Sequence, residues 1–279
     1  MRVIVLGSDG VIGRAFTHYA RERGHHVTEW DIALDSGHDL RVANSLYLKD
    51  VDFVAFFAFD VGGSKYSTTT AEYISNNMKL LENTFSVIRD SGVPFIHTTS
   101  QMSNMDHNPY GPLKRVAEFY TEYLGGINIK VWNVYGPEEI GDKSHAVADF
   151  IHQAKTGGRI RMLTDGEETR QFLHTEDFAV AACHIMENFE SVKGKYGSMI
   201  DISNYEWVSI KTVADIIAQF YHAELRPGSI TSSFQTKVNE PSTDFLASGW
   251  KPSISLKDGI EGLCTQSQLL NTKLNGFLP

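Results

Sequence analysis

The sequence predicts an α/β fold with a doubly wound parallel sheet and a smaller C-terminal cap. From residue 1 to about 135, short apolar runs alternate with helical patterns, and strands that alternate with helices form crossover units of a parallel sheet. The apolar run at 53–59 shows no alternation of polar and apolar residues, which is typical of a strand covered by helices on both faces. Beyond Tyr135-Gly136-Pro137, turn signals become frequent and indicate a less regular second part.

Each element has its own signal. The apolar run at 3–6 predicts the first strand, and a glycine-rich turn leads from it into a helix at 11–23. The same alternation predicts strands at 26–30, 53–59, 95–98 and 127–133, and helices at 71–89 and from Tyr110 onward. A further sheet strand near 199–202 indicates that the two parts interleave along the chain. We therefore expect one domain of residues 1–135 and 171–203 and a second of residues 136–170 and 204–279.

The composition is that of an ordinary globular enzyme. The chain has 279 residues, of which 42% are apolar and 21% charged. At this length a chain buries roughly three quarters of its unfolded surface, so the core needs neither a disulfide nor a metal ion. The two cysteines, Cys183 and Cys264, lack the spacing of a zinc site or a disulfide framework, and no histidine pair has metal-ligand spacing. We expect no metal and a reducing, cytoplasmic location.

Charge and hydropathy argue against two kinds of partner. The net charge of −9 repels polyanions, and no cluster of Lys and Arg interrupts it, so we expect no nucleic-acid partner. The N-terminus runs into the first strand without a signal-peptide pattern, and the longest apolar run is too short to span a bilayer. We therefore expect no membrane association.

The turn after the first strand has the spacing of a dinucleotide site. The segment Gly7-Ser8-Asp9-Gly10-Val11-Ile12-Gly13 follows a strand and opens into a helix. Free N–H groups at a helix N-terminus attract phosphate, and glycines let a pyrophosphate approach the backbone. The three glycines, with Asp9, Val11 and Ile12, are therefore candidate cofactor-binding residues in a Rossmann domain.

An acidic residue after the second strand favours NAD over NADP. Asp31 can accept hydrogen bonds from an adenosine ribose, whereas a 2′-phosphate would meet a like charge worth up to ~4 kcal/mol at 4 Å and an effective dielectric of 20. No Lys or Arg lies between Arg23 and Arg41 to offset that repulsion. Glu29 is the alternative carboxylate, and NADP remains the less favoured cofactor.

A tyrosine and a lysine share one face of a predicted helix. Tyr110 and Lys114 are four residues apart, so their side chains lie together. A phenol must lower its pKa by about 3 units to act as a base near neutrality, and a nearby ammonium supplies an effect of that order. This pair suits proton transfer to or from a sugar hydroxyl.

Taken together, these segments resemble the extended short-chain dehydrogenase/reductase family, and within it the NAD-dependent epimerase/dehydratase group that acts on nucleotide sugars. The segments that carry the resemblance are the three glycines, Asp31, Thr98-Thr99-Ser100, Tyr110-Gly111-Pro112-Leu113-Lys114, Asn133-Val134-Tyr135-Gly136-Pro137 and Gly249-Trp250-Lys251-Pro252-Ser253. The resemblance implies that the first domain binds NAD, that the second is a substrate-binding cap for a nucleoside-diphosphate sugar, and that the protein is a homodimer paired through long helices that include 110–123.

The resemblance also implies roles for individual residues. Tyr110 would be the acid/base, Lys114 would hold the cofactor ribose and lower the pKa of the tyrosine, and Thr99, or else Ser100, would polarise the sugar oxygen. Asp39, Leu40 and Asn77 match positions that line the cofactor. Gly62, Ser100, Asn133, His145 and Arg170 match the sugar-nucleotide site, with Arg170 on the diphosphate and His145 as a further catalytic acid/base.

Three further segments, Asp60-Val61-Gly62-Gly63, Asn76-Asn77-Met78 and Ser144-His145, resemble those of enzymes of the GDP-fucose synthase and GDP-mannose 3,5-epimerase type. Gln101 stands where the 3,5-epimerases carry a cysteine, and with Ser100 it replaces the acidic pair of the 4,6-dehydratases, so both reactions are disfavoured. The remaining hypotheses are epimerisation at one carbinol, most readily C4, and reduction of a 4-keto sugar. A non-catalytic dinucleotide sensor is the third, although a sensor has no need of the Tyr110 and Lys114 pair.

Overall fold

A computed structural model describes residues 1–61, 71–106, 108–141, 144–229 and 239–275, and the chain forms two compact units. The first unit comprises residues 1–132, 175–202 and 242–251, and the second comprises 133–174, 203–241 and 252–279. Along the described parts of the chain, no helix is both long enough and apolar enough to cross a membrane.

The first unit is built on a six-stranded sheet in which every strand pair is parallel. The strands, in spatial order, are β2 (His26–Trp30), β1 (Arg2–Leu6), β3 (Phe53–Phe56), β4 (Phe95–Ser100), β5 (Ile127–Val131) and β10 (Met199–Ile202). The chain runs outward from β1 to β2 and then returns to β3 on the other side of β1. This reversal is the topological switch point at which doubly wound sheets bind ligands, and the predicted fold class is confirmed.

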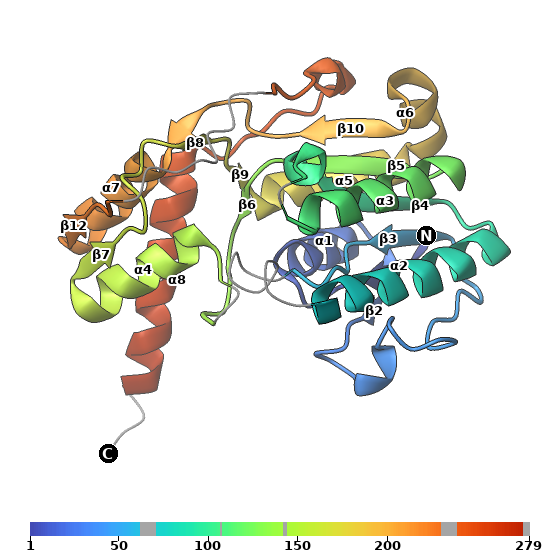
Figure 1. Cartoon of the computed structure of the whole chain (residues 1–279), viewed down its shortest axis with the longest axis horizontal. Coiled ribbons are helices and arrows are strands. Elements are labelled where there is room, and N and C mark those ends of the chain that lie inside the picture. Colours follow the sequence, from blue (N-terminus) through green and yellow to red (C-terminus); the bar gives the residue numbers. More distant parts are fainter. Residues whose placement is uncertain (62–70, 107, 142–143, 230–238, 276–279) are drawn as a thin grey trace. The chain divides into compact units, whose positions relative to one another are not determined.

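Helices cover both faces of this sheet. The helices of the first unit are α1 (Val11–Glu22), α2 (Ala71–Ser91), α3 (Tyr110–Tyr123), α5 (Thr175–Glu187) and α6 (Phe189–Tyr196). Figure 1 shows α2 and α3 on one face and α1 and α5 on the other. Apolar side chains of the sheet and of α2 form a core under them, in which Leu6, Phe56, Leu81 and Phe85 are almost fully buried. Burial on both faces explains why β3 lacks alternation.

A C-terminal segment returns to the first unit. Residues 242–251, which the sequence assigns to the second domain, belong here because their polar and aromatic side chains are anchored on the sheet and its helices. The backbone N–H of Ser242 donates to Asp201 Oδ2 at 3.2 Å, and the indole N–H of Trp250 donates to the Asp177 carbonyl at 3.3 Å. Within the segment, η3 (Asp244–Ser248) buries Phe245 against Trp250.

The second unit is a helical core with short strand pairs. Its helices are α4 (Ala146–Gly157), α7 (Ile210–Tyr221) and α8 (Leu256–Asn275). Its strands pair as β6 (Val134–Tyr135) with β9 (Leu173–His174), β7 (Arg159–Arg161) with β12 (Glu224–Arg226), and β8 (Thr169–Arg170) with β11 (Val208–Ser209). Apolar residues at helical spacing, such as Val147, Ile151 and Ala154 of α4, pack together with Ile217 of α7.

Candidate active site

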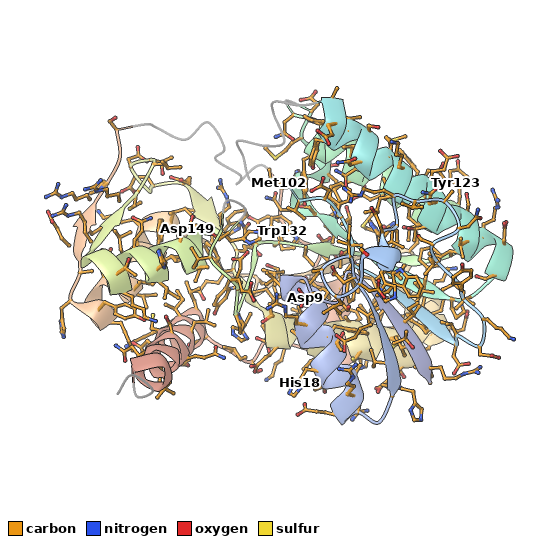
Figure 2. The ribbon with its side chains drawn as sticks, turned by 90° about the horizontal axis from the view of Figure 1, so that it is seen from below. Asp9, His18, Met102, Tyr123, Trp132 and Asp149 are labelled. Atoms are coloured by element: carbon orange, nitrogen blue, oxygen red, sulfur yellow. The ribbon has the colours of Figure 1, made fainter. Side chains whose placement is uncertain are left out.

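The turn between β1 and α1 places a glycine-lined backbone at a helix N-terminus. Gly7 has a φ of +84°, and a Cβ there would lie 2.6 Å from the backbone nitrogen of Ala58. A Cβ at Gly13 would lie 2.0 Å from the carbonyl oxygen of Gly7. Gly7 requires glycine because of its positive φ and the backbone that follows β3, and Gly13 requires it because the start of α1 packs directly on the turn. Figure 2 labels Asp9 in this turn, beside the start of α1.

The residues of this turn fit a dinucleotide pyrophosphate. No side chain caps α1 at Gly10, and its first turn holds no acidic residue. The Ser8 hydroxyl is fully buried and has no hydrogen-bond partner within the described residues. An N-terminus left open in this way presents partial positive charge and N–H donors to an anion. Val11 and Ile12 form the first turn of α1, as the sequence predicts.

Two carboxylates flank the same turn. Asp31, just after β2, accepts the backbone N–H of Asp9 at 3.0 Å and that of Ala33 at 2.9 Å. The Asp9 carboxylate lies 3.0 Å from Nε of Arg14. Asp31 therefore links the end of β2 to the glycine turn while remaining partly exposed.

The expected adenine-side residues are held by their own neighbours. Nε and Nη2 of Arg41 donate to the Asp39 carboxylate at 2.8 and 2.9 Å, and this pairing lowers the pKa of Asp39. Leu40 is buried in the core, and its carbonyl accepts from Nδ2 of Asn83 at 3.1 Å. The segment is rigidly placed, with Asp39 engaged in an ion pair.

The side chain of Asn77 stabilises the turn after β3 by hydrogen bonds. Its Oδ1 accepts the Asp60 N–H at 2.9 Å, and its Nδ2 donates to the carbonyls of Asp60 and Tyr73 at 3.2 and 3.1 Å. The side chain is fully buried, so Asn77 acts on this edge of the sheet by fixing the backbone at Asp60. Gly62, a predicted substrate-site residue, lies outside the described residues.

Tyr110 is the first residue of α3, and its phenol lies beside the side chain of Ser100. Oδ1 of Asn108 accepts the Tyr110 N–H at 3.0 Å and fixes the helix start. The sequence leads us to expect a lowered tyrosine pKa. Instead, burial raises the pKa of Tyr110, and the hydrogen bond from Ser100 only partly opposes that effect.

Lys114 lies one turn further along the same face. Its side chain is buried, and Nζ donates to the Thr98 carbonyl at 3.0 Å. Nζ also lies 4.0 Å from the centre of the Phe59 ring and 6.0 Å from that of Tyr110. Burial lowers the pKa of Lys114 to about 7, whereas Glu118 raises it. The lysine is therefore close to its own titration at neutral pH.

The hydroxyl beside Tyr110 belongs to Ser100 and not to Thr99, the residue that the resemblance favours. Thr99 Oγ1 donates instead to Oε1 of Glu118 at 2.7 Å. Successive side chains of a strand point to opposite faces, so β4 sends these two neighbours apart. Ser100 is the last residue of the strand and also accepts the Met102 N–H at 3.1 Å, which starts η2 (Gln101–Asn104).

Glu118 is the buried acid that the sequence reasoning missed. It follows Tyr110 and Lys114 at the same four-residue spacing, and this spacing could have placed it on their face. A glutamate in an amphipathic helix is ordinarily exposed, however, and here it is 8% exposed.

In the second unit, His145 forms a pair with Glu138. Nδ1 of His145 lies 2.7 Å from Oε1 of Glu138, and the backbone N–H of His145 donates to Oε2 at 3.0 Å. His145 is the N-cap residue of α4 and is exposed. The hydrogen bond to Glu138 raises the pKa of the imidazole, which favours its protonated, donating form.

Two further predicted residues also lie in this unit. Asn133 is exposed between β5 and β6, and its carbonyl accepts the Leu173 N–H at 2.9 Å. Arg170 lies in β8, where Nη1 donates to the Thr169 carbonyl at 2.7 Å. Burial lowers the pKa of Arg170 and Glu168 opposes that effect, so the guanidinium keeps its charge. Across the described ranges, no group of three or more His, Cys, Asp or Glu could hold a metal ion.

Comparison with known proteins places these features in a family. The model of the NAD dependent epimerase/dehydratase family matches residues 3–199. A dTDP-4-dehydro-6-deoxy-D-allose reductase from Streptomyces sp is 23% identical over 77% of this chain and 79% of its own length. A probable GDP-L-fucose synthase from Oryza sativa subsp. japonica is 22% identical over 93% of this chain and 89% of its own length. The solved structure of an epimerase from Methanothermobacter thermautotrophicus is similar with a TM-score of 0.81, at 18% identity over 97% of this chain and 94% of that one.

Proposed function

We propose, from the premise that this chain belongs to the NAD dependent epimerase/dehydratase family, that it epimerises a nucleoside-diphosphate sugar by transient oxidation at one carbinol carbon, C4 foremost. The observation that carries the proposal is the buried phenol of Tyr110 beside Ser100, with Nζ of Lys114 6.0 Å from its ring centre and one turn away on the same face of α3. Such an arrangement moves one proton at one oxygen atom, which is what a carbinol oxidation requires.

Each residue has a defined task in this proposal. NAD, when bound along the glycine turn, supplies the acceptor for the carbinol hydride and later returns it. Tyr110 takes the proton of the sugar hydroxyl and gives it back, Ser100 donates to the oxygen as charge develops there, and Lys114 holds a cofactor ribose hydroxyl while its charge stabilises the phenolate. In the second unit, Arg170 binds the diphosphate, and Asn133 and His145 contact the sugar nucleotide.

The carboxylates around the glycine turn favour NAD as the cofactor. Asp31 and Asp9 are joined by the 3.0 Å hydrogen bond from the Asp9 N–H, and Arg14 pairs with Asp9. A 2′-phosphate beside Asp31 would face a like charge, whereas a ribose 2′-hydroxyl can donate to it. A tightly kept NAD suits an epimerase because oxidation and reduction balance within one turnover.

A second candidate is net reduction of a nucleotide 4-keto sugar. The names of the two curated relatives favour it, since one is a reductase of a dTDP-4-dehydro sugar and the other a probable GDP-L-fucose synthase. The same Tyr110, Ser100 and Lys114 would serve, with Tyr110 giving a proton to the new alkoxide.

The test begins with the dinucleotide released on denaturing the purified protein, identified and quantified by mass spectrometry. Stoichiometric NAD supports the epimerase, and incubation with a panel of nucleotide sugars should then yield epimers without added cofactor. Protein without dinucleotide that consumes NADPH with a 4-keto sugar would establish the second candidate.

Tyr110→Phe tests the chemistry directly. Because the variant lacks only the phenolic hydroxyl, turnover should fall at least about a thousandfold, while NAD affinity stays within a few fold. Isothermal titration with NAD and a coupled turnover assay measure the two effects. Full activity in this variant would refute the role of Tyr110 as the acid/base, whereas turnover by neither protein would support a dinucleotide sensor instead.

A further inference from the structure

A buried polar layer lies behind Lys114, between α3 and the sheet. We call it the Glu118 layer, and its members are Glu118 of α3, Thr99 and His97 of β4, and Lys130 and Asn128 of β5. The register of β4 and β5 pairs Thr99 with Lys130 and His97 with Asn128, so the four strand residues meet the helix side by side.

Contacts from both strands hold Glu118 in place. Oε1 accepts the Thr99 hydroxyl at 2.7 Å and lies 3.6 Å from Nζ of Lys130. Nδ2 of Asn128 donates to the Glu118 carbonyl at 3.0 Å. Burying a carboxylate costs free energy unless nearby cations and hydrogen-bond donors compensate its charge. Thr99 and Lys130 provide that compensation and hold the Glu118 carboxylate in one orientation.

The negative charge of Glu118 favours the protonated form of Lys114. The lysine is 5% exposed and lies one helical turn before Glu118 on the same face. Its ordinary pKa of 10.5 falls to about 7 through burial, and Glu118 is the group that opposes the fall. A neutral amine can neither stabilise a phenolate nor donate three hydrogen bonds.

We propose that Glu118 is a positioning residue whose buried carboxylate, held by Thr99 and Lys130, supplies the countercharge that retains the ammonium form of Lys114. The proposal rests on the proposed function, because that function requires the charged form of Lys114. The proposal also explains why Thr99 points away from Tyr110. Ser100, at the end of β4, faces Tyr110. The preceding residue, Thr99, orients the carboxylate of Glu118 behind Lys114.

The other charged and titratable groups around Lys114 are compatible with this assignment. Tyr110 lies on the same helix, His97 faces it from β4, and Lys130 lies behind Glu118 on β5. Burial and the nearby Lys114 lower the pKa of His97 well below its ordinary value, so the imidazole adds no second charge. With Lys114, Lys130 and Glu118 charged, Lys114 and the Glu118 layer together carry one net positive charge, which is the charge that a phenolate at Tyr110 balances.

Binding of NAD without sugar, measured by titration between about pH 5.5 and about pH 9, tests the proposal. Affinity should fall as pH rises through the pKa of Lys114, and in Glu118→Gln the midpoint of that fall should move to lower pH. Thr99→Val should move it in the same direction by less. Lys130→Gln should move it to higher pH because a competing cation is removed. Glu122→Gln, an exposed glutamate one turn further along α3, should leave it unchanged.

Opposite shifts in Glu118→Gln and Lys130→Gln are the signature of electrostatic control, because a merely structural ion pair would weaken binding equally at every pH in both variants. Glu118→Asp should return the midpoint toward that of the natural protein. An unmoved midpoint in Glu118→Gln, or shifts of the same sign in the two variants, would overturn the proposal. If Glu118→Gln does not fold, Thr99→Val and Lys130→Gln still decide the matter.

Unfolding by urea provides a readout without any cofactor. Lys114 has a pKa of about 7 in the folded protein against 10.5 for the exposed group, so above pH 7 the unfolded chain binds the additional proton. Its contribution to stability therefore rises with pH between these two values. Lys114→Met should abolish this rise, and Glu118→Gln should start it at lower pH. Because neither measurement uses a sugar, a failed sugar panel would refute the proposed function and leave the role of Glu118 decided separately.

Discussion

At the scale of single residues, the pKa values of Tyr110 and Lys114 depend on burial and on neighbours that oppose its effect. Burial drives Tyr110 and Lys114 toward their neutral forms, raising the pKa of the phenol and lowering that of the amine. Ser100 and Glu118 act in the other direction, each favouring a charged form. A tyrosine and a lysine at helical spacing therefore do not fix their own protonation states, and the side chains beside them matter as much.

Ser100→Ala should lower kcat by about tenfold to a hundredfold, because it removes a donor to the oxygen on which charge develops. Loss of that hydrogen bond raises the pKa of Tyr110, so the limb of the pH–rate profile on which the phenol loses its proton should move to higher pH. Steady-state kinetics across pH measures both effects. Ser103→Ala is the control, since this buried hydroxyl of η2 has no hydrogen-bond partner among the described residues. Equal losses in the two variants would contradict the role given to Ser100.

Asp31→Asn should improve NADP binding at least about tenfold relative to NAD, because it removes a like charge from the expected position of the 2′-phosphate. The amide oxygen can still accept one of the two backbone N–H groups that Asp31 binds. Titration with both dinucleotides gives the ratio. Asp35→Asn is the matched control. Like Asp31, Asp35 accepts the backbone N–H of the residue two positions later, here Gly37 at 2.8 Å. An unchanged ratio in Asp31→Asn would mean that another group selects the cofactor.

At the scale of elements, the strands and helices of the first unit could be predicted because each has a strong local signal. The strands at 3–6, 26–30 and 199–202 and the helices at 11–23 and 71–89 lie within a residue or two of their predicted bounds. The contacts of the side chains at the end of β4 could not be predicted from the sequence. Alternation predicts that Thr99 and Ser100 point apart, but which of them reaches Tyr110 depends on how α3 crosses the strand, and that crossing is set by packing.

Gly111→Ala tests the packing that sets this crossing. A Cβ at Gly111 would lie 1.9 Å from the Met105 carbonyl oxygen and 2.8 Å from that of Met102, so the first turn of α3 would have to move off η2. We expect a loss of about 2 kcal/mol or more in unfolding free energy, together with loss of turnover through displaced Tyr110. Urea unfolding measures the first effect. Gly194→Ala in α6, where a Cβ meets nothing within 4 Å, should instead stabilise by about 0.5–1 kcal/mol.

At the scale of the whole molecule, the chain divides its tasks between two units with separate cores. The glycine turn, Asp31 and the Tyr110 helix all belong to the first unit, and Asn133, His145 and Arg170 belong to the second. The sequence leads us to expect a first domain of residues 1–135 and 171–203, and the first unit comprises residues 1–132, 175–202 and 242–251. That expectation omits residues 242–251, because their attachment depends on distant groups such as Asp201 and the Asp177 carbonyl, and a local pattern carries no signal for those.

The predicted homodimer is the property of the whole molecule that is most directly tested. Apolar side chains are exposed on the neighbouring helices α2 and α3, namely Ile74 and Met78 on the first and Phe119, Tyr120 and Tyr123 on the second. These side chains lie on two helices that contact each other, and we propose that a second copy of this chain covers them.

Phe119→Glu should therefore shift the protein from dimer to monomer, because it would bury a charge without a partner in an apolar contact. Light scattering coupled to size-exclusion chromatography gives the mass, which should halve from twice 31.2 kDa. Leu163→Glu, at a residue of the second unit that is 77% exposed, should leave the mass unchanged. A monomeric natural protein, or a Phe119→Glu variant of unaltered mass, would show that these helices do not form the interface.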